Sequence, residues 1–365
     1  MTSLFFIIFL VGYIYEDSDS LLISDDSLVI CGYHQYNLKV HLTNNTILKV
    51  RSWNGTDSTG KVILQAPFIY IHNSMIDGAG MGYAGGTNTH PDGYGPGYGH
   101  AGVGGGGGGG AYGGAGGEGG DLDPGAGGAP YGNISDTVIN MGSGGGAGRL
   151  GSVDGFGGKG GSLIYLKAQK IIVDTSSILS SGLRGNDGSY EAGGGGSGGG
   201  VKMQADTVRL RYSTVLAKGG AGGDAAGGGG GGAGGGRIKV FYTVVDTNNL
   251  NLSVSGGNGG LGGFGNGENG SAGSIYFGPL VALEEAGQDE LPVFYIQPRI
   301  ISGWAIIYSE KDSGDLLIYD SVGRLAKKMR ITCRIQKFDM SELQNGVYFA
   351  KINGCKSITK IVLVK

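Results

Sequence analysis

The sequence predicts an all-β protein, in which a glycine-rich parallel β-helix or solenoid is followed by a small C-terminal Ig-like β-sandwich. Three observations lead to this fold class. Apolar and polar residues alternate in short runs, one such pattern recurs at a fixed distance, and glycine becomes sparse from about Glu290 onward. The predicted order is a signal peptide at 1–16, the solenoid at 17–280, a linker at 281–293 and the sandwich at 294–365.

The N-terminus carries an apolar run from Leu4 to Tyr15, followed by the acidic pair Glu16 and Asp17. A membrane-spanning helix needs about 20 apolar residues, so this run is too short to cross a bilayer. Its length suits the apolar core of a secretory signal, although no Lys or Arg precedes it. A buried first strand is the alternative interpretation. No other segment is apolar for long enough to predict a transmembrane span.

The central region contains an internal repeat whose register can be counted. The alternating pattern that starts at Ile164 recurs at Val201 and again at Ile238, each time 37 residues later. The same pattern at Val62 lies 102 residues before Ile164. Each unit reads as two short strands joined by a polar bend such as Asp174–Ser177, and a glycine-rich excursion then leads to the next unit. A unit this small buries its apolar face only by stacking on its neighbours, which predicts in-register ladders of a parallel solenoid.

Glycine dominates the segment that contains these units. The chain has 82 glycines, and ten of them lie outside Gly78–Gly278, so that stretch holds 72. Collagen is excluded because glycine comes in runs such as Gly104–Gly110 and the chain has only 8 prolines. A disordered linker fits poorly because 39% of the residues are hydrophobic. The formal net charge of −3 provides no basic surface for nucleic acid.

Two interpretations of the glycine tracts stay open. In the first, the tracts are mobile loops, and glycine gives flexibility without bulk. In the second, they pack against each other as extended polyglycine helices with three residues per turn, which only glycine permits at such close approach. Interspersed alanines such as Ala126 and Ala233 fit a tightly packed layer. The long stretch between the first two units is expected to form a large loop on one side of the solenoid.

The order of features in the central region resembles that of a known group of proteins. A strand is followed by a glycine tract, by Tyr131-Gly132-Asn133, by the segment Met141–Gly146 and by a further strand. This order is similar to that of glycine-rich β-helix surface proteins of bacteria, over about residues 30–280. The resemblance implies a surface protein whose body is a β-helix.

The C-terminal region contains groups of residues in a recognisable order. They are Leu316–Leu325, Phe338–Leu343 and Asn345–Ile352, followed near the end by Lys360–Val362. In order, spacing and terminal position they resemble the C-terminal sorting domain of the bacterial type IX secretion system. An ordinary Ig-like terminal module is the alternative interpretation.

This second resemblance implies a location, a partner and a set of functional residues. The protein would be exported to the periplasm of a Gram-negative bacterium, cross the outer membrane through the type IX machinery, and be released or attached at the cell surface. The resemblance assigns the sorting signal to Gly323, Gly346, Val347, Tyr348, Lys351, Lys360 and Val362.

No catalytic constellation emerges, and the chain is not predicted to be an enzyme. The acidic residues near the repeat form no recurring pair at one strand position, although a β-helix that cleaves polysaccharide needs clustered carboxylates. Gly116–Asp121 and Gly219–Asp224 each fit the first six places of a calcium-binding nonapeptide repeat, but no tandem array follows. No cofactor is therefore predicted; calcium remains an alternative, with Asp121, Asp123 and Asp224 as its best candidates.

Five tyrosines of the glycine-rich region lie between the first two repeat units: Tyr83, Tyr94, Tyr98, Tyr112 and Tyr131. They either form an adaptable binding surface suited to stacking on sugars, or merely cover glycine backbone. Together these observations predict a secreted, cell-surface structural or adhesin-like protein, with surface polysaccharide or other cell surfaces as candidate partners. The alternatives are a carbohydrate-binding or polysaccharide-cleaving β-helix, and a calcium-stabilised solenoid.

Overall fold

A computed structural model of the chain describes residues 12–150 and 152–280 and, nearer the C-terminus, 294–297, 300–301, 304–309, 314–321, 323–333, 335–352 and 358–364. The chain divides into two compact units, Met1–Val281 and Ala282–Lys365. Every regular element of the described residues is a β-strand, which confirms the all-β prediction. The predicted linker 281–293 and residues 1–11 of the predicted signal peptide lie outside the described residues.

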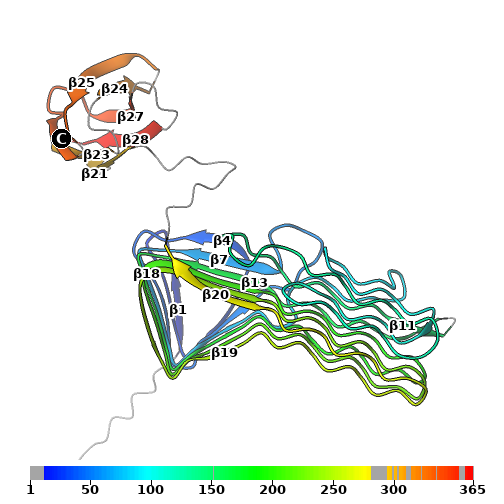
Figure 1. Cartoon of the computed structure of the whole chain (residues 1–365). Helices are drawn as coiled ribbons and strands as arrows, with labels where there is room; N and C mark the ends of the chain where they lie inside the picture. Colours follow the sequence, from blue (N-terminus) through cyan, green and yellow to red (C-terminus); the bar gives the residue numbers. More distant parts are fainter. Residues whose placement is uncertain are drawn as a thin grey trace, which may run out of the picture. The chain divides into compact units, whose positions relative to one another are not determined.

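The first unit contains an 11-stranded sheet in which nearly all neighbouring strands are parallel (Figure 1). Its strands come from successive turns of the chain, and β1 alone pairs antiparallel, with β2. The strands are β1 (Tyr13–Glu16), β2 (Ser20–Ser24), β4 (Gly32–Gln35), β5 (Lys39–Thr43), β7 (Lys61–Gln65), β8 (Phe68–His72), β13 (Leu163–Lys167), β14 (Lys170–Asp174), β16 (Gly200–Arg211), β18 (Arg237–Asn248) and β20 (Ser274–Pro279).

A second, six-stranded sheet of parallel strands runs beside it, in the order β19-β17-β15-β9-β6-β3. Its strands are β3 (Ser27–Ile30), β6 (Ile47–Val50), β9 (Met75–Asp77), β15 (Ser177–Leu179), β17 (Thr214–Leu216) and β19 (Asn251–Ser253). Apolar residues of both sheets form one core, in which Ile71, Ile164 and Ile178 are fully buried. We call the two sheets together the strand stack.

The predicted 37-residue register is confirmed. Ile164 pairs with Val201, and Val201 pairs with Ile238, while Val62 pairs with Ile164 across the predicted 102 residues. Because each of these residues is fully buried, the counted positions form a continuous apolar ladder. The unit that starts at Ile164 has three strands where two were predicted, since its first extended segment is divided into β13 and β14.

Two earlier turns of the strand stack were not found in the sequence. Strands β2 and β3 form one, and β4, β5 and β6 form the next, in which β4 pairs with β7. Ser20 pairs with Lys39, and Lys39 pairs with Phe68 in the same ladder. These turns lack a glycine excursion and are 19 residues long, from Ser20 to Lys39, and 29 residues long, from Lys39 to Phe68, so neither has the 37-residue spacing. Strand β1, within the predicted signal peptide, covers the first edge of the sheet with its own side chains exposed.

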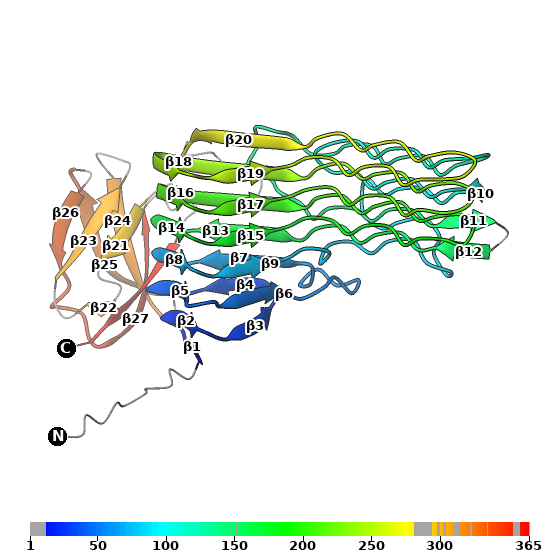
Figure 2. The same ribbon diagram turned by 90° about the horizontal axis from the view of Figure 1, so that it is seen from below.

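Each later turn of the strand stack sends a pair of glycine tracts away from the sheets. After β15 the chain runs outward along residues 180–188, turns, and returns along 191–199 to β16. The next turns do the same, and the longer stretch 78–162 adds further tracts. Figure 2 shows these tracts as long extended traces that leave the strands side by side. We call them the glycine bundle.

The tracts of the glycine bundle are held by backbone hydrogen bonds between neighbours. Three successive glycines bond to three different tracts: Gly194 N–H to Gly146 O at 2.9 Å, Gly195 N–H to Gly231 O at 2.9 Å, and Gly196 N–H to Leu183 O at 2.9 Å. An extended helix with three residues per turn has this property, because consecutive N–H groups point in directions a third of a turn apart. The packed interpretation of the tracts is therefore confirmed, and the expected large loop at 78–162 is part of the packed bundle.

Packing explains why these positions are glycine. Residues 191–200 and 227–236 are buried throughout, and a Cβ added at Gly194 would meet the backbone oxygen of Gly108 well inside 3.0 Å. In the outer tract of residues 255–261, every third residue has a side chain. Ser255, Asn258 and Leu261 occupy these places and are exposed. A three-residue period of side chains therefore marks the outer tracts of the bundle, and nearly pure glycine marks the inner ones.

The second unit contains two smaller sheets. One has the order β21-β23-β26 and the other β22-β28-β27-β24-β25. Ala305 and Phe338 of the first share a core with Ile318 and Ala350 of the second. The strands are β21 (Phe294–Gln297), β22 (Ile300–Ile301), β23 (Trp304–Ser309), β24 (Gly314–Asp320), β25 (Leu325–Ile331), β26 (Ile335–Asp339), β27 (Gly346–Ile352) and β28 (Ile358–Leu363). Among the described strands of this unit, all pairs are antiparallel except β22 with β28, which is parallel, and the Ig-like assignment stays a prediction.

Candidate functional site

The predicted sorting-signal residues lie mainly on one hairpin of the second unit. Strands β27 and β28 are antiparallel, and their backbone register pairs Val347 with Val362 and Phe349 with Lys360. Gly346, at the start of β27, pairs with Leu363. Six of the seven predicted residues therefore lie on the two strands of this hairpin. Gly346, Val347, Tyr348 and Lys351 are on β27, and Lys360 and Val362 are on β28.

Tyr348 is the buried member of this group. Its side chain alternates with those of its neighbours, so it enters the core while Val347 and Phe349 lie on the outer face. The Tyr348 hydroxyl donates a hydrogen bond to the carbonyl oxygen of Gln344 at 2.9 Å. This contact ties the start of β27 to the turn before it, which is a structural role.

Gly323 lies apart from the hairpin, in the turn between β24 and β25. Its φ is +83°, and nothing lies within 4 Å of the place a Cβ would take, so backbone conformation rather than space requires glycine. The turn is closed by Asp320, whose carboxylate accepts from the backbone N–H of Arg324 at 2.9 Å and pairs with its guanidinium at 2.9 Å.

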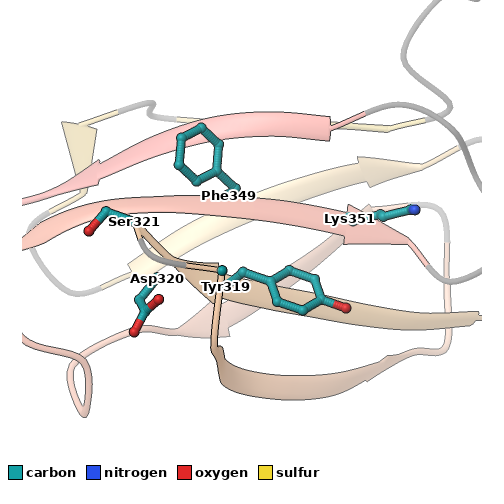
Figure 3. A pocket seen from close by; sticks show the side chains of 6 residues that line it. Tyr319, Asp320, Ser321, Phe349 and Lys351 are labelled. Carbon is teal, nitrogen blue, oxygen red and sulfur yellow. The ribbon is translucent and has the colours of Figure 1, made fainter.

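A shallow hollow of about 310 Å³ lies between the turn that contains Gly323 and strand β27. It is lined by Tyr319, Asp320, Ser321, Gly323, Phe349 and Lys351. Figure 3 shows the side chains of Tyr319, Phe349 and Lys351 extending from neighbouring strands. Tyr319 pairs with Phe349 in the register of β24 and β27, which brings the two rings onto the same face. The hollow thus combines aromatic rings with one cation and one carboxylate.

The comparison with known families decides what this region is. Residues 302–365 match the secretion system C-terminal sorting domain. The chain therefore carries a type IX sorting domain and is a secreted or cell-surface protein. No curated protein and no solved structure matches the chain. None of the described segments forms a helix that could span a membrane.

The far end of the glycine bundle carries a second candidate site, which the sequence did not suggest. There the small sheet of β10 (Gly104–Gly105), β11 (Gly148–Leu150) and β12 (Ser152–Gly155) lies among the turns of the glycine tracts (Figure 2). Large apolar side chains are exposed at these turns. Five of them are Val103 (74%), Leu122 (77%), Tyr190 (39%), Leu261 (67%) and Phe264 (70%), and we call these five the tip surface.

Backbone contacts join these turns into one surface. The Tyr190 and Phe264 rings lie 5.9 Å apart, and both residues bond to Gly227, with Phe264 N–H donating to its oxygen and Tyr190 O accepting from its N–H. On the other side, Val103 N–H donates to Asp123 O at 3.0 Å. Gly265 packs directly against the Asp121 backbone, which connects the two halves.

Carboxylates surround the tip surface. They are Asp121, Asp123, Asp154, Asp187, Glu191 and Asp224, and the cations of the same turns are Arg149 and Arg184. Arg184 pairs with Asp187 at 2.6 Å and with Asp224 at 2.8 Å. The backbone N–H of Asp224 and the Arg184 guanidinium hold the pKa of Asp187 below its usual value. The tip therefore carries an excess of negative charge.

Glu191 is the buried member of these carboxylates. It is fully buried; its Oε2 accepts from Gly228 N–H at 3.0 Å, while its Oε1 has no partner. Burial raises the pKa of Glu191, the Gly228 N–H opposes that rise, and the charges of Asp121 and Asp154 add to it.

The three calcium candidates of the sequence fall at this tip. Asp121 and Asp123 have positive φ values of 75° and 49° and shape the turn that exposes Leu122. Asp224 is committed to Arg184 and also accepts from Leu261 N–H at 2.7 Å. Among the residues that the structure describes, no three His, Cys, Asp or Glu side chains are placed to hold one metal ion.

The five tyrosines between the first two repeat units have mostly structural surroundings. Tyr112 is fully buried, and its hydroxyl accepts from Asn140 N–H at 2.8 Å, while burial raises its pKa to about 12. The Tyr131 hydroxyl donates to Met141 O, and the Tyr83 and Tyr94 rings pack on Trp53. Tyr98 is 36% exposed and is the most open of these five rings, and the sugar-stacking role stays a prediction.

Two buried lysines of the strand stack, Lys202 and Lys239, hold the loop of residues 133–138 against it. The Lys239 ammonium is 1% exposed and donates to the oxygens of Asn133, Asp136 and Val138, including the Asp136 carboxylate at 2.6 Å. Burial lowers the pKa of Lys239, although the Asp136 carboxylate opposes the shift. In the preceding turn, Lys202 donates to Thr137 O at 2.8 Å. This loop is therefore a fixed part of the body.

Proposed function

We propose that this protein is a structural or adhesin-like protein of the cell surface. Its body would be a rigid β-helix with an attached glycine bundle, delivered by the sorting domain through the type IX machinery. The observation that supports this proposal best is the backbone packing of the glycine tracts, which hold a set of turns far from the strand stack. Loops fixed at the end of a rigid body suit contact with another surface.

Catalysis is not part of the proposal. The carboxylates gathered at the tip are used in turns and ion pairs, as Asp154 is by the backbone N–H of Glu191 at 2.9 Å and Asp224 is by Arg184. Calcium stabilisation is disfavoured by the same pairing of Asp224, and no specific observation favours a polysaccharide-cleaving activity. The proposed partner of the sorting domain is the secretion machinery, and that of the body is another surface.

Export is tested by removing the sorting domain. A chain that ends at Val281 should stay inside a bacterium with an active type IX system, whereas the full chain reaches the surface or medium. The measurement is protection from protease added to intact cells, with Val244→Ser in the full chain as control, because Val244 is 56% exposed on the body. Equal surface exposure of both chains would show that delivery does not depend on this domain.

A further inference from the structure

We propose that the tip surface is a binding site for a basic, apolar protein surface: a partner segment that presents aliphatic or aromatic side chains beside Lys or Arg. This inference rests on the proposed adhesive role and names the chemistry of its partner. It concerns the five exposed residues Val103, Leu122, Tyr190, Leu261 and Phe264, which come from four different turns.

The exposure of these residues is unusual for their surroundings. The tracts that end here are glycine almost everywhere, and the side chains that precede Leu261 along the outer tract are small or polar, as Ser255 and Asn258 are. At the turns themselves, Leu122 and Phe264 are 77% and 70% exposed, although nothing in the backbone packing requires a large apolar side chain there. Grouped exposed apolar residues on a protein surface mark contact sites.

The glycine bundle also gives this surface a fixed shape. Gly227, beneath Tyr190 and Phe264, is bonded to both, and Gly120, next to Asp121, donates to Gly229 O at 2.8 Å. The turns therefore need little ordering when a partner binds, which lowers the entropy cost of association.

Charge selects the partner. Apart from the buried Glu191, five carboxylates and two guanidinium groups lie at these turns, and Arg184 is already paired with two of the carboxylates. A second copy of the same tip, or a membrane of anionic lipid, would bring like charges together and is disfavoured. The most exposed side chains of the tip surface include the aliphatic Val103, Leu122 and Leu261, which favours a protein partner over a sugar, since sugars stack on aromatic faces. A basic, apolar protein surface satisfies both properties.

The experiment uses the full chain and a labelled synthetic peptide of alternating Leu and Lys, with a Leu and Glu peptide for comparison. Binding is followed by fluorescence anisotropy. The Leu–Lys peptide should bind, the Leu–Glu peptide should bind at least about tenfold more weakly, and the variant Leu122→Ser/Phe264→Ser should lose about tenfold or more in affinity. The exposed Val244→Ser variant, on β18, is the matched control and should bind as the natural chain does.

A second pair of substitutions tests the charge. Asp121→Asn/Asp123→Asn should weaken Leu–Lys binding about two- to tenfold and reduce its dependence on salt, because Asp123 is exposed and Asp121 is half-buried beside it. Folding of each variant is checked by its thermal melt. Equal binding of the two peptides, unchanged binding by the Leu122 and Phe264 variant, or stronger binding to phosphatidylcholine vesicles than to the peptide would each overturn the proposal. These outcomes concern the tip alone, whereas loss of export through truncation concerns the sorting domain.

Discussion

The strand stack and the glycine bundle belong to one compact unit, yet they are stabilised in opposite ways. In the strand stack, side chains such as Ile71 and Ile164 fill the interior, and burial of apolar surface provides the stability. In the glycine bundle, the interior contains almost no side chains, and neighbouring backbones meet directly through N–H···O bonds. The first region therefore depends on side-chain volume, and the second depends on its absence.

Alanine provides the sharpest test of this difference, because it is too small for one region and too large for the other. In the strand stack, Ile171→Ala removes a fully buried side chain that stacks between Ile69 and Val208. The cavity should lower the free energy of unfolding by about 2–5 kcal/mol. Urea denaturation followed by circular dichroism measures the loss, with the half-buried Ile172→Ala as the control. A loss below that of Ile172→Ala would show that the ladder is not the source of stability.

In the glycine bundle, Gly108→Ala adds a single methyl group where the backbone oxygens of Ala126 and Gly125 lie inside 3.0 Å. Neither oxygen moves without breaking its tract, so the substitution should cost about 1–3 kcal/mol. Gly104→Ala, in the same tract, is the matched control, because its nearest neighbour is the Leu122 oxygen at 3.6 Å. Thermal melting should separate the two variants. Equal melting temperatures would mean that the tracts are not close-packed.

The smallest effect concerns Glu191, the buried carboxylate at the tip. Because its pKa is raised above the ordinary value of 4.5, its contribution to stability is fully present below pH 4.5 and is lost as the pH rises through the folded pKa. Glu191→Gln removes the buried charge and keeps an oxygen for Gly228 N–H, so it should stabilise the chain by about 1 kcal/mol at pH 7. Melts at pH 7 and pH 4 check this. An advantage that persisted undiminished at pH 4 would contradict the assignment.

Much of the strand stack could be predicted from the sequence, because its contacts repeat. Once Ile164 and Val201 are aligned, the 37-residue period fixes every later pair, and the structure shows those pairs. The turns before residue 50 could not be found by that period because they have no glycine excursion. The polar bend within each unit keeps the same backbone conformation although its sequence changes. Thr175, Tyr212 and Asn249 occupy the same place in successive bends, and all have φ near +50°.

The spacing of side chains within the glycine tracts separates outer tracts from inner ones. Ser255, Asn258 and Leu261 are three residues apart, which is the period of a polyglycine helix with one face exposed. The runs without this period, such as 227–232, are the ones buried on all sides. Composition alone left packed and mobile tracts both open, whereas this spacing distinguishes outer tracts from inner ones.

The sequence by itself determined the ladder register and the sorting-domain motif, because both are local or periodic patterns of side chains. Only the tertiary structure decided which glycine tracts are neighbours, that the turns bearing Leu122 and Phe264 form one surface, and that Glu191 is buried beneath it. The physical reason is that glycine tracts associate through backbone groups, which are identical at every position. Pairing between tracts therefore leaves no trace in side-chain identity, and it follows from how the strand stack places each excursion.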